Sequence, residues 1–409
     1  MKAHCPRSVL VISGMLLGIC LFIYCVDKHP SKTQSISSGA PPEPFAGSLA
    51  CAGCHKNIYD THIHTAHYLT SQEASLKNIK GSFEFGENRF VFSDYTYVAM
   101  EKRKNGLYQV EYNDGAEKKA RRFDITVGSG TKGQTYLYWW KDTLFQLPIS
   151  WFTDAGKWSN SPGYYRVAFG RPITSRCLEC HSTYVRVTSP PNARVDEYDH
   201  NIVFGVDCEK CHGPGLQHVR FQGEHPEEKT GKFIINPATF TRQQQLDLCM
   251  LCHGGRLEKT SPSFTFQSGD TLANYFALDT AQQNAADIDV HGNQYGLLAA
   301  SKCFRMSQMT CNTCHNTHIN EAGKPALFSQ RCITCHQEHS SNFCKLSTLS
   351  TARLKQNCID CHMPQQPSQA IMMQLEGETA PTSAYMRTHF IKVYPDETKK
   401  FLQSVKKSK

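Results

Sequence analysis

The sequence predicts a mainly α-helical fold with much irregular loop, interrupted by one small inserted β-rich module. Two observations lead to this prediction. The motif Cys-x-x-Cys-His occurs seven times in the 409 residues, and six of its copies are packed into residues 177–362. After the first copy, residues 81–172 contain no cysteine and instead alternate apolar and polar side chains, as half-buried strands do.

Each motif supplies two thiols three positions apart and a histidine directly after the second thiol. Such a motif attaches one haem covalently and gives its iron a proximal ligand. The 19 cysteines and 19 histidines, scattered at random over this length, would produce on the order of 0.04 motifs. The predicted attachment residues are Cys51, Cys54, Cys177, Cys180, Cys208, Cys211, Cys249, Cys252, Cys311, Cys314, Cys332, Cys335, Cys358 and Cys361. The predicted proximal ligands are His55, His181, His212, His253, His315, His336 and His362.

Paired cysteines with short spacing also bind zinc or iron–sulfur clusters, and they form disulfides. Zinc ribbons do not need a histidine after every second cysteine, and a two-residue gap is too tight for seven routine disulfides. The motifs therefore favour seven covalently bound c-type haems, and the chain resembles the multihaem c-type cytochromes. Because each haem is a large apolar plate, about fifty residues per haem can fold around stacked haems without long regular elements.

The N-terminal segment predicts export. Lys2 and Arg7 precede an apolar run over residues 8–26, and about nineteen residues is closer to a spanning helix than to a cleaved signal. We therefore expect residues 1–30 to be a signal anchor, with a cleaved signal or lipidation as alternatives. Each alternative puts the body on the periplasmic side of the bacterial inner membrane, where haem is attached covalently.

Composition divides the rest of the chain into further segments. Residues 31–48 have the proline, serine and glycine content of a flexible linker. A helical pattern over residues 56–80 follows the first motif. The expected segments are a first haem segment over 49–80, the β-rich insert over 81–172, a six-haem domain over 173–395 and a basic tail over 396–409.

The insert carries all four tryptophans, at positions 139, 140, 151 and 158. We expect them mainly in the core of the module, while shielding of haem edges or docking of a partner is the alternative. Alternation and the turn at Asn105 and Gly106 predict the strands. The expected strands cover 89–100, 107–112, 123–127 and 134–140.

The formal charge of +8 does not indicate a nucleic-acid partner. Seven haems would add about fourteen propionate charges, so the basic excess largely balances the haems. We expect no nucleic acid as a partner. The expected partners are redox proteins in the periplasm or inner membrane, and the membrane itself through the N-terminal segment.

Histidines outside the motifs are candidates for the sixth position of each iron. His318 and His339 each lie three residues after a proximal histidine, and one short turn cannot wrap a porphyrin. Such local histidines are therefore expected to bind the iron of a neighbouring haem.

Several segments resemble one family, the multihaem cytochromes that include the tetrahaem electron acceptor of hydroxylamine oxidoreductase. They are Cys54-His55-Lys-Asn-Ile-Tyr59 with His67, Val206-Asp-Cys208-Glu-Lys-Cys211-His212-Gly-Pro-Gly215-Leu-Gln-His218, Met309-Thr-Cys311-Asn-Thr-Cys314-His315-Asn-Thr-His318, and Arg387-Thr-His389. The resemblance implies that His67, His218, His318 and His389 are distal ligands. The chain departs from this family in having His62 where a tryptophan is usual and in carrying the β-rich insert.

Two further distal ligands, His291 and His339, are expected. The seventh stays open between His62, His64, His200, His225 and no residue at all. Outside the motifs and the export segment, Cys303 and Cys344 form either a disulfide or two buried free thiols.

These patterns predict an electron carrier that cycles bis-histidine haem iron between its ferric and ferrous states, with no catalytic residue. The alternative is a multihaem reductase or oxidoreductase that acts on a small nitrogen or sulfur compound at one five-coordinate haem. A structural filament of stacked haems is a third class.

Overall fold

The computed structural model describes residues 45–164, 169–278 and 284–407. The predicted signal anchor and most of the predicted linker lie outside the described residues. Within the described ranges, no helix combines the length and the apolar character needed to cross a membrane.

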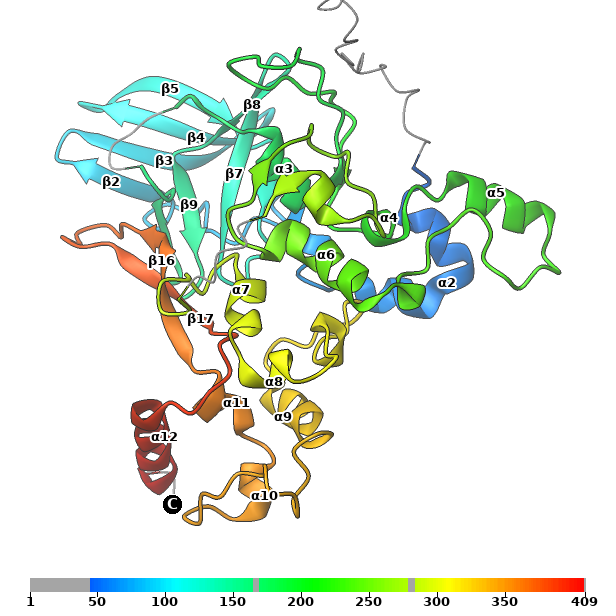
Figure 1. Ribbon diagram of the computed structural model, residues 1–409. Helices are drawn as coiled ribbons and strands as arrows, with labels where there is room; N and C mark the ends of the chain where they lie inside the picture. Colours follow the sequence, from blue (N-terminus) through cyan, green and yellow to red (C-terminus); the bar gives the residue numbers. More distant parts are fainter. Residues whose placement is uncertain (1–44, 165–168, 279–283, 408–409) are drawn as a thin grey trace, which may run out of the picture. The chain divides into compact units, whose positions relative to one another are not determined.

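The prediction of a mainly α-helical fold was wrong. Of the residues that the structure describes, helices hold 28% and strands 24%. The haem motifs lie on short helices, whereas the strands form two large sheets and also occur outside the predicted insert, as in the orange hairpin of Figure 1. Sequence patterns underestimated the strand content because β1 has only three residues and β16 is partly exposed, with few buried positions, so neither shows a clear alternation.

The elements follow one another along the whole described chain. The helices are α2 Ser48–His62, α3 Ser175–His181, α4 Cys208–His212, α5 Leu216–Glu224, α6 Arg242–His253, α7 Gln294–Ala299, α8 Lys302–Arg305, α9 Pro325–Ile333, α10 Thr351–Leu354, α11 Cys358–His362 and α12 Pro395–Lys407. The 3-10 turns are η1 Tyr68–Thr70, η2 Pro237–Thr239, η3 Leu272–Asn274 and η4 Cys311–Thr313. The strands are β1 Ser71–Glu73, β2 Arg89–Ser93, β3 Thr96–Arg103, β4 Gly106–Asn113, β5 Ala116–Arg122, β6 Ile125–Val127, β7 Gly133–Trp140, β8 Thr143–Gln146, β9 Ile149–Phe152, β10 Lys157–Asn160, β11 Arg171–Pro172, β12 Ser182–Tyr184, β13 Val203–Phe204, β14 Glu258–Lys259, β15 Phe276–Ala277, β16 Gln365–Met373 and β17 Thr382–Arg387.

The predicted helix over residues 56–80 was also wrong, because α2 ends at His62 and the chain continues as η1 and β1. At the end of α2 the Thr65 hydroxyl donates to the His62 carbonyl at 2.7 Å. This bond occupies an acceptor that the next helical turn would use, and the backbone then turns toward the sheet.

A four-stranded antiparallel sheet has the order β2-β3-β4-β5. The predicted strand over 89–100 is divided between β2 and β3 by a tight turn at Asp94 and Tyr95. The connection from β4 to β5 places Asp114 and Gly115 at φ of 50° and 73°. Two successive positive φ angles are typical of the hairpin turn that matches the twist of antiparallel strands.

A seven-stranded sheet contains the path β1-β6-β7-β8-β11, with β9 pairing both β7 and β10. Strand β7 pairs β9 at Gly133 and Gln134 and pairs β8 from Leu137 to Trp140. A Cβ atom on Gly133 would lie 2.7 Å from the carbonyl oxygen of Trp151, so the close approach of these strands requires glycine.

The two sheets share one aromatic-rich core. Buried Val98 and Met100 of the smaller sheet cluster with Tyr136, Ile149 and Trp158 of the larger one. The buried Gln109 side chain also joins the sheets, because it donates to the Ile149 carbonyl at 2.7 Å and accepts from the Ile149 amide at 3.0 Å. Of the four tryptophans Trp158 is buried, whereas Trp140 is 55% exposed.

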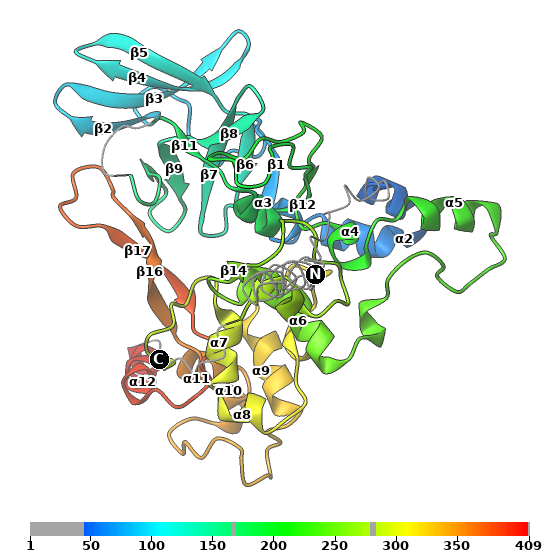
Figure 2. The ribbon, with the colours of Figure 1, turned by 45° about the horizontal axis from the view of Figure 1, so that its top comes forward.

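The β-rich part packs directly against the haem-motif helices. Leu178 of α3 belongs to the same cluster as Ile125, Leu137 and Leu144 of the larger sheet. Figure 2 shows α3 and β12 between this sheet and helices α4 and α6; α3 contacts α6, and β12 contacts α4. Beyond residue 300 the apolar core becomes sparse, and the buried apolar side chains between 300 and 362 are Phe304 and Ile359.

Replacing Gly205 by alanine is expected to lower the free energy of unfolding by more than about 3 kcal/mol. Gly205 has φ of 67°, and an added Cβ would lie 2.1 Å from the Tyr68 carbonyl oxygen. Gly292→Ala is the matched control, since Gly292 has φ of 77° with nothing within 4 Å of the added Cβ. This control is expected to lose about 1–2 kcal/mol in urea unfolding, and equal losses in the two variants would contradict the predicted clash.

Candidate haem-binding site

The motifs lie mainly at the ends of short helices. Helices α3, α4, α6 and α11 each end at the histidine of a motif. Residues three and four positions apart share one face of a helix, so both thiols and the histidine point to the same side. Motif one lies within α2, where His55 has non-helical φ and ψ of −107° and 38°. Motif five forms the 3-10 turn η4, and motif six begins in α9.

Every cysteine in the described ranges is a free thiol, as haem attachment requires. Thiols from different motifs lie close enough to interact in four pairs, and the elements that carry them are also in contact. The pairs are Cys51 with Cys208, Cys180 with Cys252, Cys249 with Cys311, and Cys332 with Cys358. Motif three is therefore beside motif one, motif four is beside motifs two and five, and motif seven is beside motif six.

Three proximal histidines each have a histidine from a distant segment facing them. The ring centroids of His212 and His318 are 6.2 Å apart, with an angle of 27° between the planes. The rings of His315 and His389 are also 6.2 Å apart, at 28°. The rings of His67 and His253 are 6.2 Å apart at 63°. Each pair thus joins a motif to a histidine predicted as a distal ligand.

This separation fits two imidazoles on opposite sides of one iron. Imidazole nitrogens bind metal ions at about 2.0 Å, which places the centres of two opposed rings about 6 Å apart. Among the described side chains, no group of three or more His, Cys, Asp or Glu residues gathers around a common metal position. The residues present therefore fit haem iron held between two histidines.

Ring nitrogens of the candidate ligands are oriented by hydrogen bonds. A ligating histidine usually donates its second ring N–H to a nearby acceptor, which fixes the ring and leaves the other nitrogen free for the metal. Six histidines have this arrangement at Nδ1. The acceptors are Thr70 Oγ1 for His181, the Ile235 carbonyl for His212, the Lys232 carbonyl for His218, Gln294 Oε1 for His253, the Asn342 carbonyl for His336 and the Lys392 carbonyl for His362, at 2.8–3.1 Å.

Burial keeps several of these imidazoles neutral, which metal binding requires. Desolvation lowers the pKa of His67, His181 and His389 to about 4. It lowers the pKa of His253 and His318 as well. At neutral pH the rings are therefore in the protonation state in which a nitrogen lone pair is available.

Comparison with known proteins agrees with this geometry. Residues 166–213, which include motifs two and three, match the family described as cytochrome c554 and c-prime. The chain is 26% identical over 180 residues to the multiheme cytochrome MtrA of Shewanella baltica, covering 40% of this chain and 52% of that protein. The chain is therefore similar to multihaem c-type cytochromes.

The chain is also 25% identical over 178 residues to the C-type polyheme cytochrome OmcC of Geobacter sulfurreducens, covering 43% of this chain and 22% of that protein. The chain thus spans about half of the first curated relative and less than a quarter of the second. Its fold is similar to the crystal structure of the outer cell wall cytochrome OcwA, with a TM-score of 0.51 and 17% identity over 87% of this chain and 81% of that one.

The three other predicted distal ligands, His218, His291 and His339, have no proximal histidine ring directly opposite them among the described side chains. His291 lies close enough to His181 to lower its pKa electrostatically, which associates it with motif two. His218 is half-buried and His339 is exposed, and the ring contacts of the described residues place no second histidine ring against either. The assignments of all six distal histidines stay predictions.

Two of the four candidates for the seventh distal position have their Nε2 atoms occupied. His62 Nε2 lies 3.2 Å from the Val206 carbonyl oxygen. His200 Nε2 lies 3.1 Å from Asp142 Oδ1, and its ring stacks on Trp139 with centroids 4.1 Å apart. Neither arrangement leaves Nε2 free for iron. His64 and His225 are exposed and stay open as candidates.

The two cysteines outside the motifs lie near different motifs of the chain. Cys303 interacts electrostatically with Cys314 and Cys335 of motifs five and six. Cys344 interacts with Cys361 of motif seven. Both are free thiols in the structure, but Cys303 is half-buried and Cys344 is exposed, so they do not match the alternative of two buried thiols either.

A buried carboxylate fixes the first described residues beside motif three. Glu209, which is 3% exposed, accepts hydrogen bonds from the amides of Ala46, Gly47 and Gly215 at 2.7, 2.9 and 2.7 Å. The sequence did not reveal this contact, because glutamate inside a Cys-x-x-Cys motif has no recognised role. The Glu209 carboxylate thus joins the segment before α2 to the loop after α4.

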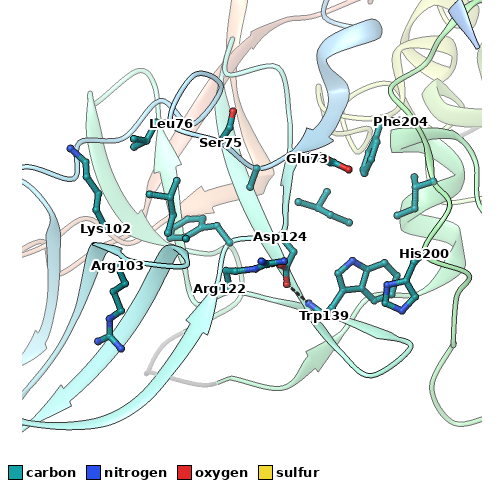
Figure 3. A pocket seen from close by; sticks show the side chains of 16 residues that line it. Glu73, Ser75, Leu76, Lys102, Arg103, Arg122, Asp124, Trp139, His200 and Phe204 are labelled. Carbon is teal, nitrogen blue, oxygen red and sulfur yellow. Dashed lines mark hydrogen bonds and ion pairs between the residues drawn. The ribbon is translucent and has the colours of Figure 1, made fainter.

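A cleft of about 630 Å³ lies on the β-rich part of the chain (Figure 3). Trp139 and His200 line one side of it. Three cations also line it, but each is ion-paired within the protein: Lys102 with Glu84, Arg103 with Glu117, and Arg122 with Asp124. None of these three cations is free to attract an anionic ligand.

Proposed function

We propose that the chain is a heptahaem electron relay that faces the periplasm and passes electrons between redox proteins through bis-histidine haems. The observation that carries this proposal is the 6.2 Å separation in three histidine pairs that each include a proximal histidine. A filled sixth position favours electron transfer over substrate binding at the iron.

The proposed ligand pairs join segments that are far apart in sequence. His318, which follows motif five, is proposed for the iron of motif three, and His67, which follows motif one, for that of motif four. His389, near the C-terminus, is proposed for the iron of motif five. Each haem would thereby fasten two segments together, and loss of one ligand would loosen both.

The thiol contacts support a continuous relay. Contacts between the thiols of motifs one and three, of two, four and five, and of six and seven bring the haem attachment points together. Cys211 of motif three interacts electrostatically with Cys249 of motif four, and Cys314 of motif five with Cys335 of motif six. The haems, when bound, supply one-electron cycling between ferric and ferrous iron.

The proposed location rests on the sequence. The apolar run over residues 8–26 would anchor the relay at the periplasmic side of the inner membrane, and a cleaved signal would release it into the periplasm. In either case the partners are redox proteins, and the contacts to them are brief and polar.

Two measurements on the full-length protein test the relay. A pyridine haemochrome assay is expected to find seven haems per chain. Voltammetry of the adsorbed protein is expected to give reversible waves that nitrite, hydroxylamine and sulfite leave unchanged. A haem count far below seven would refute the cofactor assignment, and a catalytic current with one of these compounds would refute the carrier function.

Replacement of His67 by methionine is expected to retain all haems but to raise the reduction potential of one of them, because methionine ligation raises the potential of haem iron. Potentiometric titration followed by optical spectroscopy measures the shift. His200→Met is the control, since its Nε2 is bonded to Asp142. An unchanged titration of the His67 variant would remove His67 from the ligands.

A second candidate function has one specific observation in its favour. In the described part of the chain, the ring contacts place no second histidine against His55, His181, His336 or His362, and of these four only His181 has a predicted distal histidine, His291, near it. One of these irons would then be five-coordinate and open to a small nitrogen or sulfur compound. A high-spin ferric signal that changes on addition of nitrite would favour this reductase.

A further inference from the structure

His62 lies at the meeting point of three haem segments. It is the last residue of α2, which carries motif one, and it is 7% exposed. Its Nε2 lies 3.2 Å from the Val206 carbonyl oxygen, and its Nδ1 lies 3.3 Å from the Thr317 carbonyl oxygen. Whichever ring nitrogen carries the proton therefore donates to a backbone carbonyl.

The two carbonyls belong to the two halves of one proposed iron site. Val206 precedes Asp207, whose carboxylate accepts a hydrogen bond from the Cys208 amide at the start of α4, and α4 ends at His212. Thr317 precedes His318 directly. Because His212 and His318 face each other at 6.2 Å, His62 contacts the backbone on both sides of this pair.

Hydrogen bonds of two backbone amides also hold the segments around Val206 and Thr317, but neither bond connects one segment to the other as the His62 ring does. The Val206 amide donates to the His67 carbonyl at 2.8 Å, so residues 62–67 bind both polar groups of the Val206 backbone. On the other side, the His318 amide donates to Asn316 Oδ1 at 3.0 Å, which only fixes the loop locally. The His62 ring is thus a direct side-chain bridge between the two halves.

We propose that His62 is a positioning residue that sets the distance between His212 and His318 and so strengthens the bond of His318 to the motif-three iron. This inference rests on the proposed pairing of His212 with His318. The ring of His62 also lies 6.1 Å from that of His318, at an angle of 62°. Because His62 Nε2 already contacts the Val206 carbonyl oxygen, we assign His62 a contact with the backbone and not with iron.

The test uses full-length holoprotein with His62→Phe, which keeps a ring but removes the N–H donor and both ring-nitrogen contacts, and His62→Gln, which keeps an amide donor. Both variants are expected to hold as many haems as the unchanged protein. In His62→Phe, cyanide is expected to bind one ferric haem about tenfold faster, as the loss of one buried hydrogen bond would allow. His62→Gln is expected to restore most of the original rate.

His200→Phe is the matched control, since this histidine also has a bonded Nε2 but lies in the β-rich part. Should His62→Phe fail to accumulate, His62→Trp keeps one N–H donor and is expected to show a smaller acceleration in the same assay. Unchanged cyanide binding in the variant that is measured would overturn the positioning role. Loss of one low-spin signal in both His62→Phe and His62→Gln would overturn it too, because His62 would then be an iron ligand.

His318→Met separates the inference from the proposed function. A spectrum that is unchanged in this variant would refute the ligand pair itself. A changed spectrum in His318→Met together with unchanged cyanide binding in His62→Phe would refute only the role of His62.

Discussion

A chain produced without haem is expected to lose the structure of residues 302–362 while it keeps the two large sheets. Within this segment the buried apolar side chains are Phe304 and Ile359, too few to offset the conformational entropy of sixty residues. The sheets have a core of their own that includes Val98, Tyr136 and Ile149. Hydrogen exchange is expected to be faster by about 1,000-fold or more in α9 and α11, and nearly unchanged in β3 and β7.

The comparison requires the same chain from two hosts, one with and one without the machinery that attaches haem. The sheets serve as the internal control, because both regions experience identical solution conditions. Protection of α9 and α11 in the haem-free chain would contradict the idea that haem supplies the missing core of this part.

Replacement of both thiols of motif four, Cys249 and Cys252, by alanine is expected to remove one haem and to shift the potentials of three others. The thiols of this motif contact Cys311 of motif five and Cys180 of motif two, and Cys249 also interacts with Cys211 of motif three. Removal of a haem at this position takes away a charge and an apolar plate that these neighbours share.

The matched variant replaces Cys358 and Cys361 of motif seven. The thiols of this motif contact motif six, through Cys358 and Cys332. It is expected to remove one haem and to shift mainly the potential of motif six. A pyridine haemochrome assay and a potentiometric titration measure both effects. Equal disturbance by the two double variants would argue against a central position of motif four.

Local sequence patterns were sufficient for the motifs and for much of the β-rich insert. The strands predicted over 107–112 and 134–140 correspond to β4 and β7, since alternation depends only on neighbours in sequence. The helix predicted over 56–80 was wrong because contacts of the residues after His62 with the sheet outweigh local helical preference. The mainly α-helical class was wrong for a similar reason, as short strands pair across large sequence distances.

The arrangement of the candidate site depended on such distant contacts even more. The sequence implied that His318 and His67 serve other haems, but it could not indicate that their rings lie beside His212 and His253, because nothing local connects those segments. The carbonyl groups that orient the His212 and His362 rings, those of Ile235 and Lys392, could not be recognised in the sequence, since every residue has a carbonyl group.

Electron paramagnetic resonance of the oxidised full-length protein tests the proposed relay most directly. Bis-histidine ligation of all seven irons gives low-spin ferric signals only, and nitrite, hydroxylamine and sulfite leave them unchanged. A high-spin signal from about one haem in seven that shifts when one of these compounds is added would contradict the relay.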